Sequence, residues 1–558
     1  MTYSLFYVVS KFNYAAKTGH LLCLLALTFT LKLSVAMNFT SNVVETHPKT
    51  LECVIAGLAI AVVYKWTSSS LQGKKAIPNA LPFPFNRSSI LELIYLIVMS
   101  KIHGDLAAYF KHTRKRVGDV FFIGRLFSFP HVSKPCLVIL NPDDQAAIVR
   151  KEKYLEWKVN LPDTVIGIHG ERNFQTMPGG SQRHASLRKA YSSILSPKSL
   201  EKFATVIVDH FHVLWNDLAE KGEEVQIQFA IRDAQLKLMC ELLYGFDGKT
   251  EEGRKLFHNF SSDFHLTEKA LFTGPGGKKT KAYIEGLEAR QRISKILNQK
   301  FDSIFERRLQ EHEDGKLEKE EYVTGSAIVQ IVDSLIRSGC KGSNEVNGYN
   351  AYEDARENLY LLLEASHGTT QYVTTSLMFF MNHPDNRESL DRIRHEVNLL
   401  EPTYQNLKGF AFGEACIQET MRMAPIIGSI TYAIPGGKSF QVRGETLNGP
   451  IAVQLNNSNW YLDNDVFESA NSFLPERWIS GEKEVFNFAR SAFQPFGFGR
   501  HICLGYPLAK LVMAANLYCF ASVQNRSIKF DEQKVQVEPG LFPENKISDG
   551  FIGKVALS

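Results

Sequence analysis

One cysteine, set among glycines and basic residues, offers the clearest chemistry in this chain. It is the eighth residue of the segment Phe496-Gly497-Phe498-Gly499-Arg500-His501-Ile502-Cys503-Leu504-Gly505. A thiolate is a strong ligand for iron, but it forms only where the thiol pKa is low. The next residues, 506–511, have proline in the second position, as in the first turn of a helix. We therefore expect Cys503 at a helix N-terminus, where free N–H groups favour an anion. An ordinary buried cysteine is the alternative.

Other residues with chemical potential occur in spaced pairs. Four or three positions along a helix bring two side chains to one face. Such pairs are Ala365 with Thr369, His184 with Arg188, and Glu419 with Arg422. A threonine inside a helix can bond back to the carbonyl four residues earlier and open the helix locally. Taken alone, each pair is compatible with a surface contact or a structural role.

Length and composition set the limits for these sites. The 558 residues are 44% hydrophobic and 22% charged, which is typical of a globular protein with a large core. The net charge is only +4, and no basic run alternates with aromatic residues, so we expect no nucleic-acid partner. The eight cysteines form no C-x-x-C pair and no zinc spacing. This pattern favours a reducing, cytosol-facing body.

The elements that must hold these residues are mainly helical, with a minor β region. Short apolar runs at 119–123 and 136–140 predict two paired strands, and Asn141-Pro142 opens a helix through Glu152. Helical periodicity covers most of 196–400. The proline-free segment Ala351 to Met381 predicts a central helix of roughly 45 Å. After Pro425 the pattern again becomes strand-like.

Together these motifs resemble the cytochromes P-450. The string F-x-x-G-x-x-x-C-x-G resembles their haem-binding loop, Glu419-Thr420-Met421-Arg422 their E-x-x-R helix, and Pro475-Glu476-Arg477-Trp478 their P-E-R-F segment. The resemblance runs from about residue 78 to the C-terminus. It implies the cytochrome P-450 fold, with the long central helix lying over haem b.

The resemblance also assigns roles to individual residues. It implies that Cys503 is the axial thiolate ligand of the iron and that Glu419, Arg422 and Arg477 form a structural ionic triad. The residues that it implies in cofactor binding are Cys503, His184, Arg188, His501, Phe496, Gly499 and Gly505. Among these, the basic residues would neutralise the haem carboxylates.

The chain departs from the family within the central helix. The family pattern A-G-x-[D/E]-T-[T/S] becomes Ala365-Ser366-His367-Gly368-Thr369-Thr370. The resemblance implies catalytic roles for Ala365, Ser366 and Thr369, whose hydroxyl assists oxygen activation. Gly368 replaces the acid that normally carries protons. Ser366, His367, Thr370 or a water chain would have to take over that task.

The N-terminus is expected to attach the enzyme to a membrane. We divide the chain into a leader or first membrane segment (1–50), an anchor helix (51–67), a basic and proline-rich hinge (68–88) and the catalytic domain (89–558). The apolar runs 21–31 and 54–64 are short for a membrane span, and the first could instead be a signal peptide. Basic residues after the second run place the body in the cytosol. We expect the endoplasmic reticulum membrane, with a plastid or another organelle as the alternative.

The predicted function is that of a haem-thiolate monooxygenase acting on a lipophilic substrate such as a sterol, terpenoid or fatty acid. The resemblance implies electrons from NADPH through NADPH-cytochrome P-450 reductase, with cytochrome b5 as an optional second donor. Gly368 raises an alternative, an isomerase or dehydratase that acts on a pre-oxidised lipid without a reductase. A haem carrier or sensor, and a membrane protein without haem, are further alternatives.

Overall fold

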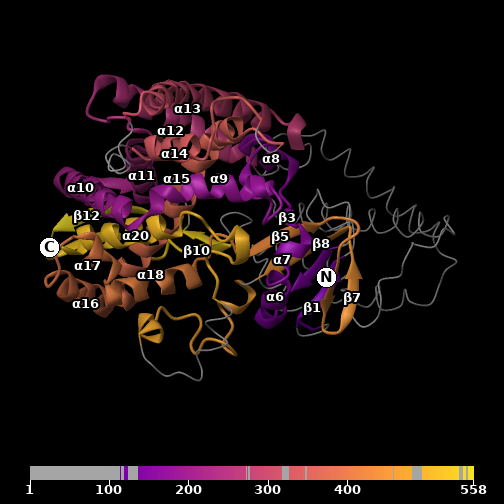
Figure 1. The fold of residues 1–558 in the computed structure, drawn as a ribbon. Helices are drawn as coiled ribbons and strands as arrows, with labels where there is room; N and C mark the ends of the chain where they lie inside the picture. Colours follow the sequence, from indigo (N-terminus) through magenta and orange to yellow (C-terminus); the bar gives the residue numbers. More distant parts are fainter. Residues whose placement is uncertain are drawn as a thin grey trace, which may run out of the picture. The chain divides into compact units, whose positions relative to one another are not determined.

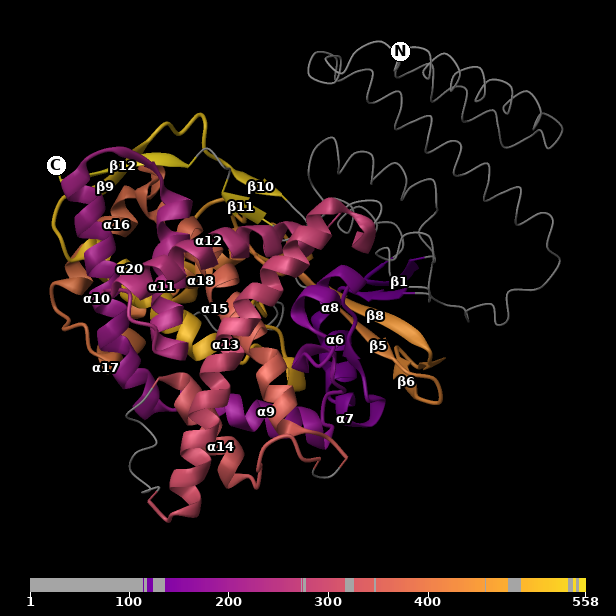
Figure 2. The same ribbon diagram turned by 90° about the horizontal axis from the view of Figure 1, so that it is seen from above.

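The long central helix predicted from the sequence organises the molecule. In the computed structural model this helix, α15, spans Ala351–Asn382 and packs against α11 (Ile227–Tyr244), α13 (Lys281–Glu313), α18 (Ala411–Met423) and α20 (Tyr506–Ala521). Figure 2 shows α15 in the middle of these helices. Its N-cap Asn350 accepts a hydrogen bond from the Glu353 amide, and proline ends the segment at Pro384. The prediction of a helix over 351–381 is confirmed.

The structure describes residues 114, 118–123, 136–271, 273, 277–316, 326–345, 348–456, 458–479, 493–539, 545–547 and 551–557. The proposed leader, anchor and hinge lie outside these residues. No helix within the described ranges is long and apolar enough to cross a membrane. The described residues belong to one compact unit made of 84–88 and 104–558.

Helices form most of this unit (Figure 1). The remaining α-helices among the described residues are α6 (Pro142–Val149), α7 (Glu152–Leu155), α8 (Asp163–His169), α9 (Gln182–Ser192), α10 (Pro197–Lys221), α12 (Glu251–Leu271), α14 (Ala327–Arg337), α16 (Arg387–Val397) and α17 (Tyr404–Lys408). The single helix predicted from Pro142 through Glu152 is wrong in one respect. It is divided into α6 and α7, because the chain turns at Arg150 and Lys151.

A small sheet lies beside the helices and joins two distant parts of the chain (Figure 2). Its strands follow the order β1 (Val120–Ile123), β2 (Cys136–Ile139), β8 (Ile451–Asn456), β5 (Ser429–Ile434) and β3 (Lys158–Val159). The antiparallel pairing of β1 with β2 confirms the two predicted strands. The parallel pairing of β2 with β8 connects them to the strand-rich region after Pro425.

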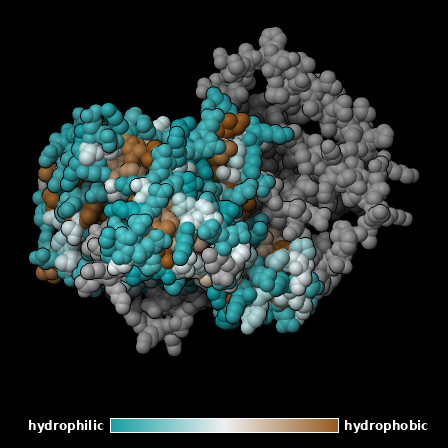
Figure 3. Space-filling view, turned by 45° about the horizontal axis from the view of Figure 1, so that its top comes forward, coloured by the Kyte–Doolittle hydropathy of each residue, from teal (hydrophilic) through white to brown (hydrophobic). Residues whose placement is uncertain are grey.

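Shorter ladders complete the β structure. They are β6 (Ser439–Val442) with β7 (Glu445–Asn448), β10 (Val537–Pro539) with β11 (Asn545–Ile547), and β12 (Ile552–Leu557) between β4 (Glu224–Gln226) and β9 (Arg526–Phe530). Buried side chains from helices α9 to α20 form one large hydrophobic cluster. The visible surface is largely hydrophilic, with scattered apolar patches (Figure 3). The mainly helical fold with a minor sheet is confirmed.

Candidate functional site

Cys503 differs from the other described cysteines in its accessibility. Its side chain is exposed, whereas those of Cys136, Cys240, Cys340, Cys416 and Cys519 are buried. It lies two residues before Gly505, the N-cap of α20, and its amide donates a 2.9 Å hydrogen bond to the Phe496 carbonyl. This bond closes the loop and holds the cysteine at the beginning of the helix. The alternative of an ordinary buried cysteine therefore does not apply to Cys503.

Glycines give the cysteine loop its shape. Gly497 and Gly499 both have φ of +69°, a left-handed conformation that side chains disfavour. A Cβ at Gly499 would lie 2.5 Å from Oε2 of Glu152, so only glycine fits there. A Cβ at Gly505, by contrast, would meet no atom within 4 Å. The loop is therefore tightly held on its Glu152 side and open beside Gly505, where a flat group could approach the backbone.

Opposing effects act on the Cys503 thiol. Protein atoms crowd the thiol although it remains accessible, and this desolvation raises its pKa. The backbone N–H groups of Gly505 and Tyr506 and the charge of Arg188 oppose that rise. The helix start thus favours a thiolate, as the sequence suggests, but does not produce one unaided. A cation bound to the sulfur would complete the deprotonation of the thiol, because a thiol that coordinates a metal ion loses its proton.

Two side chains on α9 carry buried donor atoms that could bind an anionic group beside the cysteine loop. His184 and Arg188 lie one turn apart, and Nη2 of Arg188 donates a 2.9 Å hydrogen bond to the Ile502 carbonyl, next to Cys503. Nε2 of His184 and Nη1 of Arg188 are buried without a hydrogen-bond partner among the described residues. Burial, together with the charges of His501 and Arg188, lowers the pKa of His184 to about 4. Buried donors of this kind normally have partners, and a carboxylate-bearing cofactor would supply them.

His501 already has protein partners at both ring nitrogens. Its Nδ1 lies 2.9 Å from Oε1 of Glu152, and its Nε2 lies 3.1 Å from the Met177 carbonyl oxygen. The Glu152 and His501 side chains are each only 4% exposed. The hydrogen bonds that the sequence led us to expect between His501 and a haem carboxylate therefore compete with an existing pair. His501 remains next to His184, with ring centroids 4.9 Å apart.

Glu152 is the residue that sequence reasoning missed at this site. Besides its pair with His501, it accepts a 2.6 Å hydrogen bond from the Arg500 amide. Burial alone would raise the pKa of Glu152, but the hydrogen bonds from His501 and the Arg500 amide lower it below its ordinary value. The carboxylate is thus ionised and fastens the cysteine loop to α7. A lone glutamate 351 positions before the cysteine carries no sequence signal of this role.

The predicted structural triad is brought together in the core. Nη2 and Nε of Arg422 donate to the two oxygens of Glu419 at 2.7 and 2.9 Å, and Nε of Arg477 donates to Oε1 at 3.1 Å. Glu419 and Arg422 are fully buried. The Trp478 indole adds a fourth side-chain donor, 2.9 Å from Oε2. A phenylalanine, as in the family pattern, could not donate this bond.

Only part of the motif at 365–370 in α15 is accessible to solvent. Ala365 is exposed and Thr369 is partly exposed, although they lie in the middle of a helix that is otherwise largely buried. The Thr369 hydroxyl donates a 2.9 Å hydrogen bond to the Ala365 carbonyl, and that of Ser366 donates to the Leu363 carbonyl. His367 lies on the other side of the helix, in edge contact with Phe264. The structure therefore brings Ala365 and Thr369 to one accessible face and directs His367 away from it.

Apolar side chains border the cysteine loop from β5. Cδ1 of Ile430 lies 3.5 Å from the position of a Cβ on Gly497, and Tyr432 stacks on Trp157 at 4.2 Å between ring centroids. Ile426 and Ile427 precede this strand, the former at the edge of burial and the latter exposed. These apolar side chains lie along one side of the cysteine loop.

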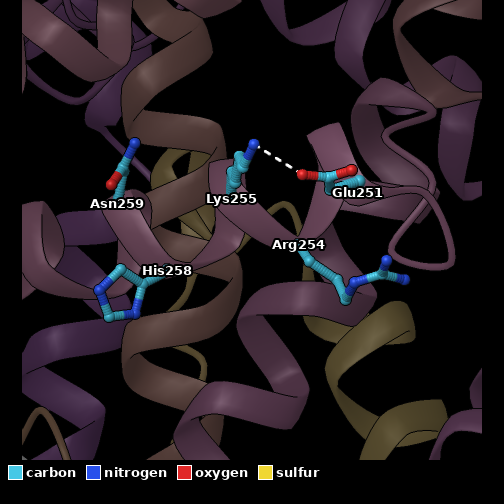
Figure 4. Close-up of a pocket in the computed structure, with 5 residues that line it drawn as sticks. All are labelled: Glu251, Arg254, Lys255, His258 and Asn259. Carbon is cyan, nitrogen blue, oxygen red and sulfur yellow. Dashed lines mark ion pairs between the residues drawn. The ribbon is translucent and has the colours of Figure 1, made fainter.

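A separate surface depression contains none of these groups. Figure 4 shows its lining residues, Glu251, Arg254, Lys255, His258 and Asn259, all from α12. Lys255 and Glu251 form an exposed ion pair of 2.7 Å. Such a pair is worth little energetically, and one helix face does not enclose a small molecule. The chemistry is instead concentrated around Cys503.

The cysteine site is a single-ligand site. Among the described residues, no group of three or more His, Cys, Asp or Glu side chains could hold a metal ion. An accessible thiol of this kind suits an iron that takes one ligand from the protein and the others from a macrocycle. The unpaired donors on α9 fit the carboxylates of such a group. These features fit a haem-thiolate class of site.

Comparisons with known proteins place the chain in such a class. The family model described as Cytochrome P450 matches residues 88–542. Taxoid 14-beta-hydroxylase of Taxus cuspidata is 21% identical, over 90% of this chain and 91% of its own length. The mitochondrial 1,25-dihydroxyvitamin D(3) 24-hydroxylase of Mus musculus is 23% identical, over 82% and 86%. A solved structure, retinoic acid bound cyanobacterial CYP120A1, has a TM-score of 0.65 at 17% identity and covers 82% of this chain and 95% of its own.

The chain belongs to the cytochrome P450 family. It is accordingly a monooxygenase of the oxidoreductase class, and family membership implies a haem iron with a thiolate ligand. The structural likeness at 17% identity supports the fold alone.

Proposed function

We propose that this P450 hydroxylates or epoxidises a lipophilic small molecule, such as a sterol, a terpenoid or a fatty acid, with haem b bound through Cys503. The observation that carries the proposal is the exposed thiol at the start of α20, next to the unpartnered donors of His184 and Arg188. The apolar border formed by Ile430 and its neighbours supports a lipophilic substrate. Two relatives are named as hydroxylases of a taxoid and of 1,25-dihydroxyvitamin D(3).

The protein's own residues have distinct tasks in this mechanism. Haem, when bound, supplies oxygen activation, while the chain supplies ligation, orientation and proton control. Cys503 provides the sulfur ligand, and His184 and Arg188 hold the carboxylates of the cofactor. Glu152 and His501 fix the loop that carries Cys503. Thr369 offers a hydroxyl on the accessible face of α15, where it can hold or pass a proton.

The first test is spectroscopic. The reduced, CO-bound difference spectrum of the wild type should contain a thiolate-type Soret band, and Cys503→Ala should lose it. Cys519→Ala, which changes a buried cysteine later in the chain, is the matched control and should retain the band. A wild type that binds haem without this band would contradict the proposed ligand.

The second test concerns substrate and electron supply. A lipid library should be incubated with the holoenzyme, NADPH and NADPH-cytochrome P450 reductase, with and without cytochrome b5. We expect oxygenated lipid products that require NADPH and reductase. Gly368 favours a second candidate, an isomerase or dehydratase for lipid hydroperoxides. Turnover of a hydroperoxide without NADPH or reductase would support that candidate and contradict the first.

We also propose attachment to the endoplasmic reticulum membrane through residues 51–67, with the catalytic domain in the cytosol. The support is the apolar run 54–64, followed by Lys65 and a basic, proline-rich hinge. The full chain should remain in the membrane pellet after carbonate extraction, and a chain beginning at residue 68 should be released. Retention of the shortened chain would contradict this anchor.

A further inference from the structure

The place of the acid that the α15 motif lacks is taken by another carboxylate of the same helix. Glu364 lies four residues before Gly368, so both occupy one helix face. A Cβ added to Gly368 would have Oε1 of Glu364 as its nearest neighbour outside the helix backbone, at 3.6 Å. This distance is an ordinary contact, so glycine is not required there for lack of space. The carboxylate of Glu364 covers the position from which an acid at 368 would project.

Glu364 is buried but not isolated. The residue is only 7% exposed, and its Oε2 lies 3.4 Å from Nε2 of His169, at the C-terminal end of α8. Neither ring nitrogen of His169 has a hydrogen-bond partner among the described residues, so its contact with Glu364 is an ion-pair contact without a hydrogen bond. Both residues therefore retain capacity to exchange a proton with water or with another polar group.

From these contacts we propose that Glu364 is the proton-relay residue of this enzyme, replacing the acid absent at position 368 and serving the hydroxyl of Thr369. This inference rests on the proposed oxygen-activating function. The proton would enter through His169, pass to the Glu364 carboxylate, and reach Thr369 through water over the Gly368 surface. Each group releases one proton for every proton it accepts, so the relay consumes no residue.

The titratable groups that interact with Glu364 are His169 from α8, Glu268 from α12, and Tyr360 and His367 from α15. Arg232 and Asp233 from α11 act on His367, and Arg290 from α13 acts on Tyr360. Burial tends to raise the pKa of Glu364, but its pair with His169 lowers it, so the carboxylate is a proton acceptor.

Glu268 is a second carboxyl group whose charge interacts with Glu364. It lies on α12 and is partly exposed, so it has access to solvent. Burial of its carboxyl group, opposed by Arg232 and reinforced by Glu364, raises its pKa to about 7. It can therefore change protonation state near neutral pH beside the relay.

The other candidates named from the sequence are less well placed. Nδ1 of His367 lies 3.3 Å from the Leu363 carbonyl oxygen, and its ring packs on Phe264, away from the accessible face. The Ser366 hydroxyl donates to the same Leu363 carbonyl. Glu364 is the group whose carboxylate reaches Gly368.

The test compares four variants as holoenzymes: Glu364→Gln, Gly368→Asp, their combination, and the control Glu357→Gln. Glu357 lies two turns earlier on α15 and pairs with Arg290. With reductase and NADPH, we expect Glu364→Gln to slow oxygen consumption about tenfold or more and to increase the solvent deuterium isotope effect. The double variant should recover most of the rate, because it returns one carboxylate to the same space. Glu357→Gln should behave as the wild type.

A readout independent of turnover is infrared titration of the ferric protein. A carboxyl band that titrates with pH should disappear in Glu364→Gln and remain in Glu357→Gln. The relay is overturned if Glu364→Gln keeps the wild-type rate and isotope effect, if Glu357→Gln loses as much activity, or if the double variant recovers nothing. If the wild type itself shows a thiolate-type CO spectrum but no reductase-dependent oxygen consumption, the proposed function fails instead.

Discussion

The carboxylate of Glu152 lies 2.9 Å from Nδ1 of His501 and binds the Arg500 amide with its other oxygen. One buried acid thus holds two consecutive residues of the cysteine loop. The loop conformation depends on α7, an element distant in sequence, as well as on its own glycines.

Removal of this acid should loosen the loop. We expect Glu152→Gln to destabilise the holoenzyme by about 3 kcal/mol, because it breaks a buried pair and leaves His501 without its counter-charge. Haem retention and the fraction of protein with the thiolate-type CO band should fall together. Glu156→Gln is the matched control, because this residue of the same segment is exposed and its partner among the described residues is Lys438. Equal loss in both variants would contradict a specific role for Glu152.

Cofactor retention should depend on the donors of α9. Arg188→Ala and His184→Ala should each speed the transfer of haem to apomyoglobin about tenfold, since charge-assisted hydrogen bonds are worth roughly 1.5–3 kcal/mol. Lys189→Ala removes a positive charge from the exposed side of the same helix and should leave the transfer rate unchanged. Unaltered transfer in both Arg188→Ala and His184→Ala would remove these residues from the cofactor site.

Trp478 offers a test of the triad without breaking it. Trp478→Phe restores the family pattern but removes a hydrogen bond to the buried carboxylate of Glu419. We expect a loss of about 1–3 kcal/mol in the free energy of unfolding, measured with urea. Trp460→Phe is the comparison, since Trp460 donates to the uncharged Leu140 carbonyl and should cost less. A smaller effect at Trp478 would contradict the importance of the acceptor charge.

Acidification should destabilise the fold through the buried His367 of α15. Burial, opposed in part by Glu364 and the Leu363 carbonyl, lowers the pKa of His367 to about 4, below its ordinary value of about 6.5. Between these values the unfolded chain binds more protons than the folded one, so stability falls as pH decreases from 6.5 to 4. His367→Leu should reduce this fall by about 3 kcal/mol. The exposed His258→Leu should not change it, and unfolding curves at pH 7 and 4.5 distinguish these outcomes.

The sequence predicted those features that depend on local pattern. The long helix 351–382 follows from its uninterrupted periodicity, and the loop of Cys503 follows from glycines whose positive φ angles the structure contains. The division of α6 from α7 was missed because a turn at Arg150 and Lys151 carries no proline or glycine. Local signals were insufficient at that point.

Contacts between segments far apart in the chain could not be predicted from the sequence. Nothing in the pattern around Glu152 indicates its pairing with His501, because that contact is set by how α7 packs on the cysteine loop. Likewise, the sequence shows Glu364 only as one polar residue of a helix, whereas the structure places its carboxylate next to Gly368. Glu419, Arg422 and Arg477 were found through the resemblance to the cytochromes P-450, because the spacing of Glu419 and Arg422 alone is also compatible with a surface contact.

The parallel pairing of β2 with β8 also has a consequence for biosynthesis. The two strands are separated by more than half of the chain, so a ribosome must complete residue 456 before the sheet can close. Loop closure over such a distance is slow compared with local helix formation. Helices can therefore form during translation, whereas β2 can pair with β8 only after β8 has been synthesised. The proposed binding of the cofactor through Cys503 would then follow the synthesis of both strands, because Cys503 comes later in the chain.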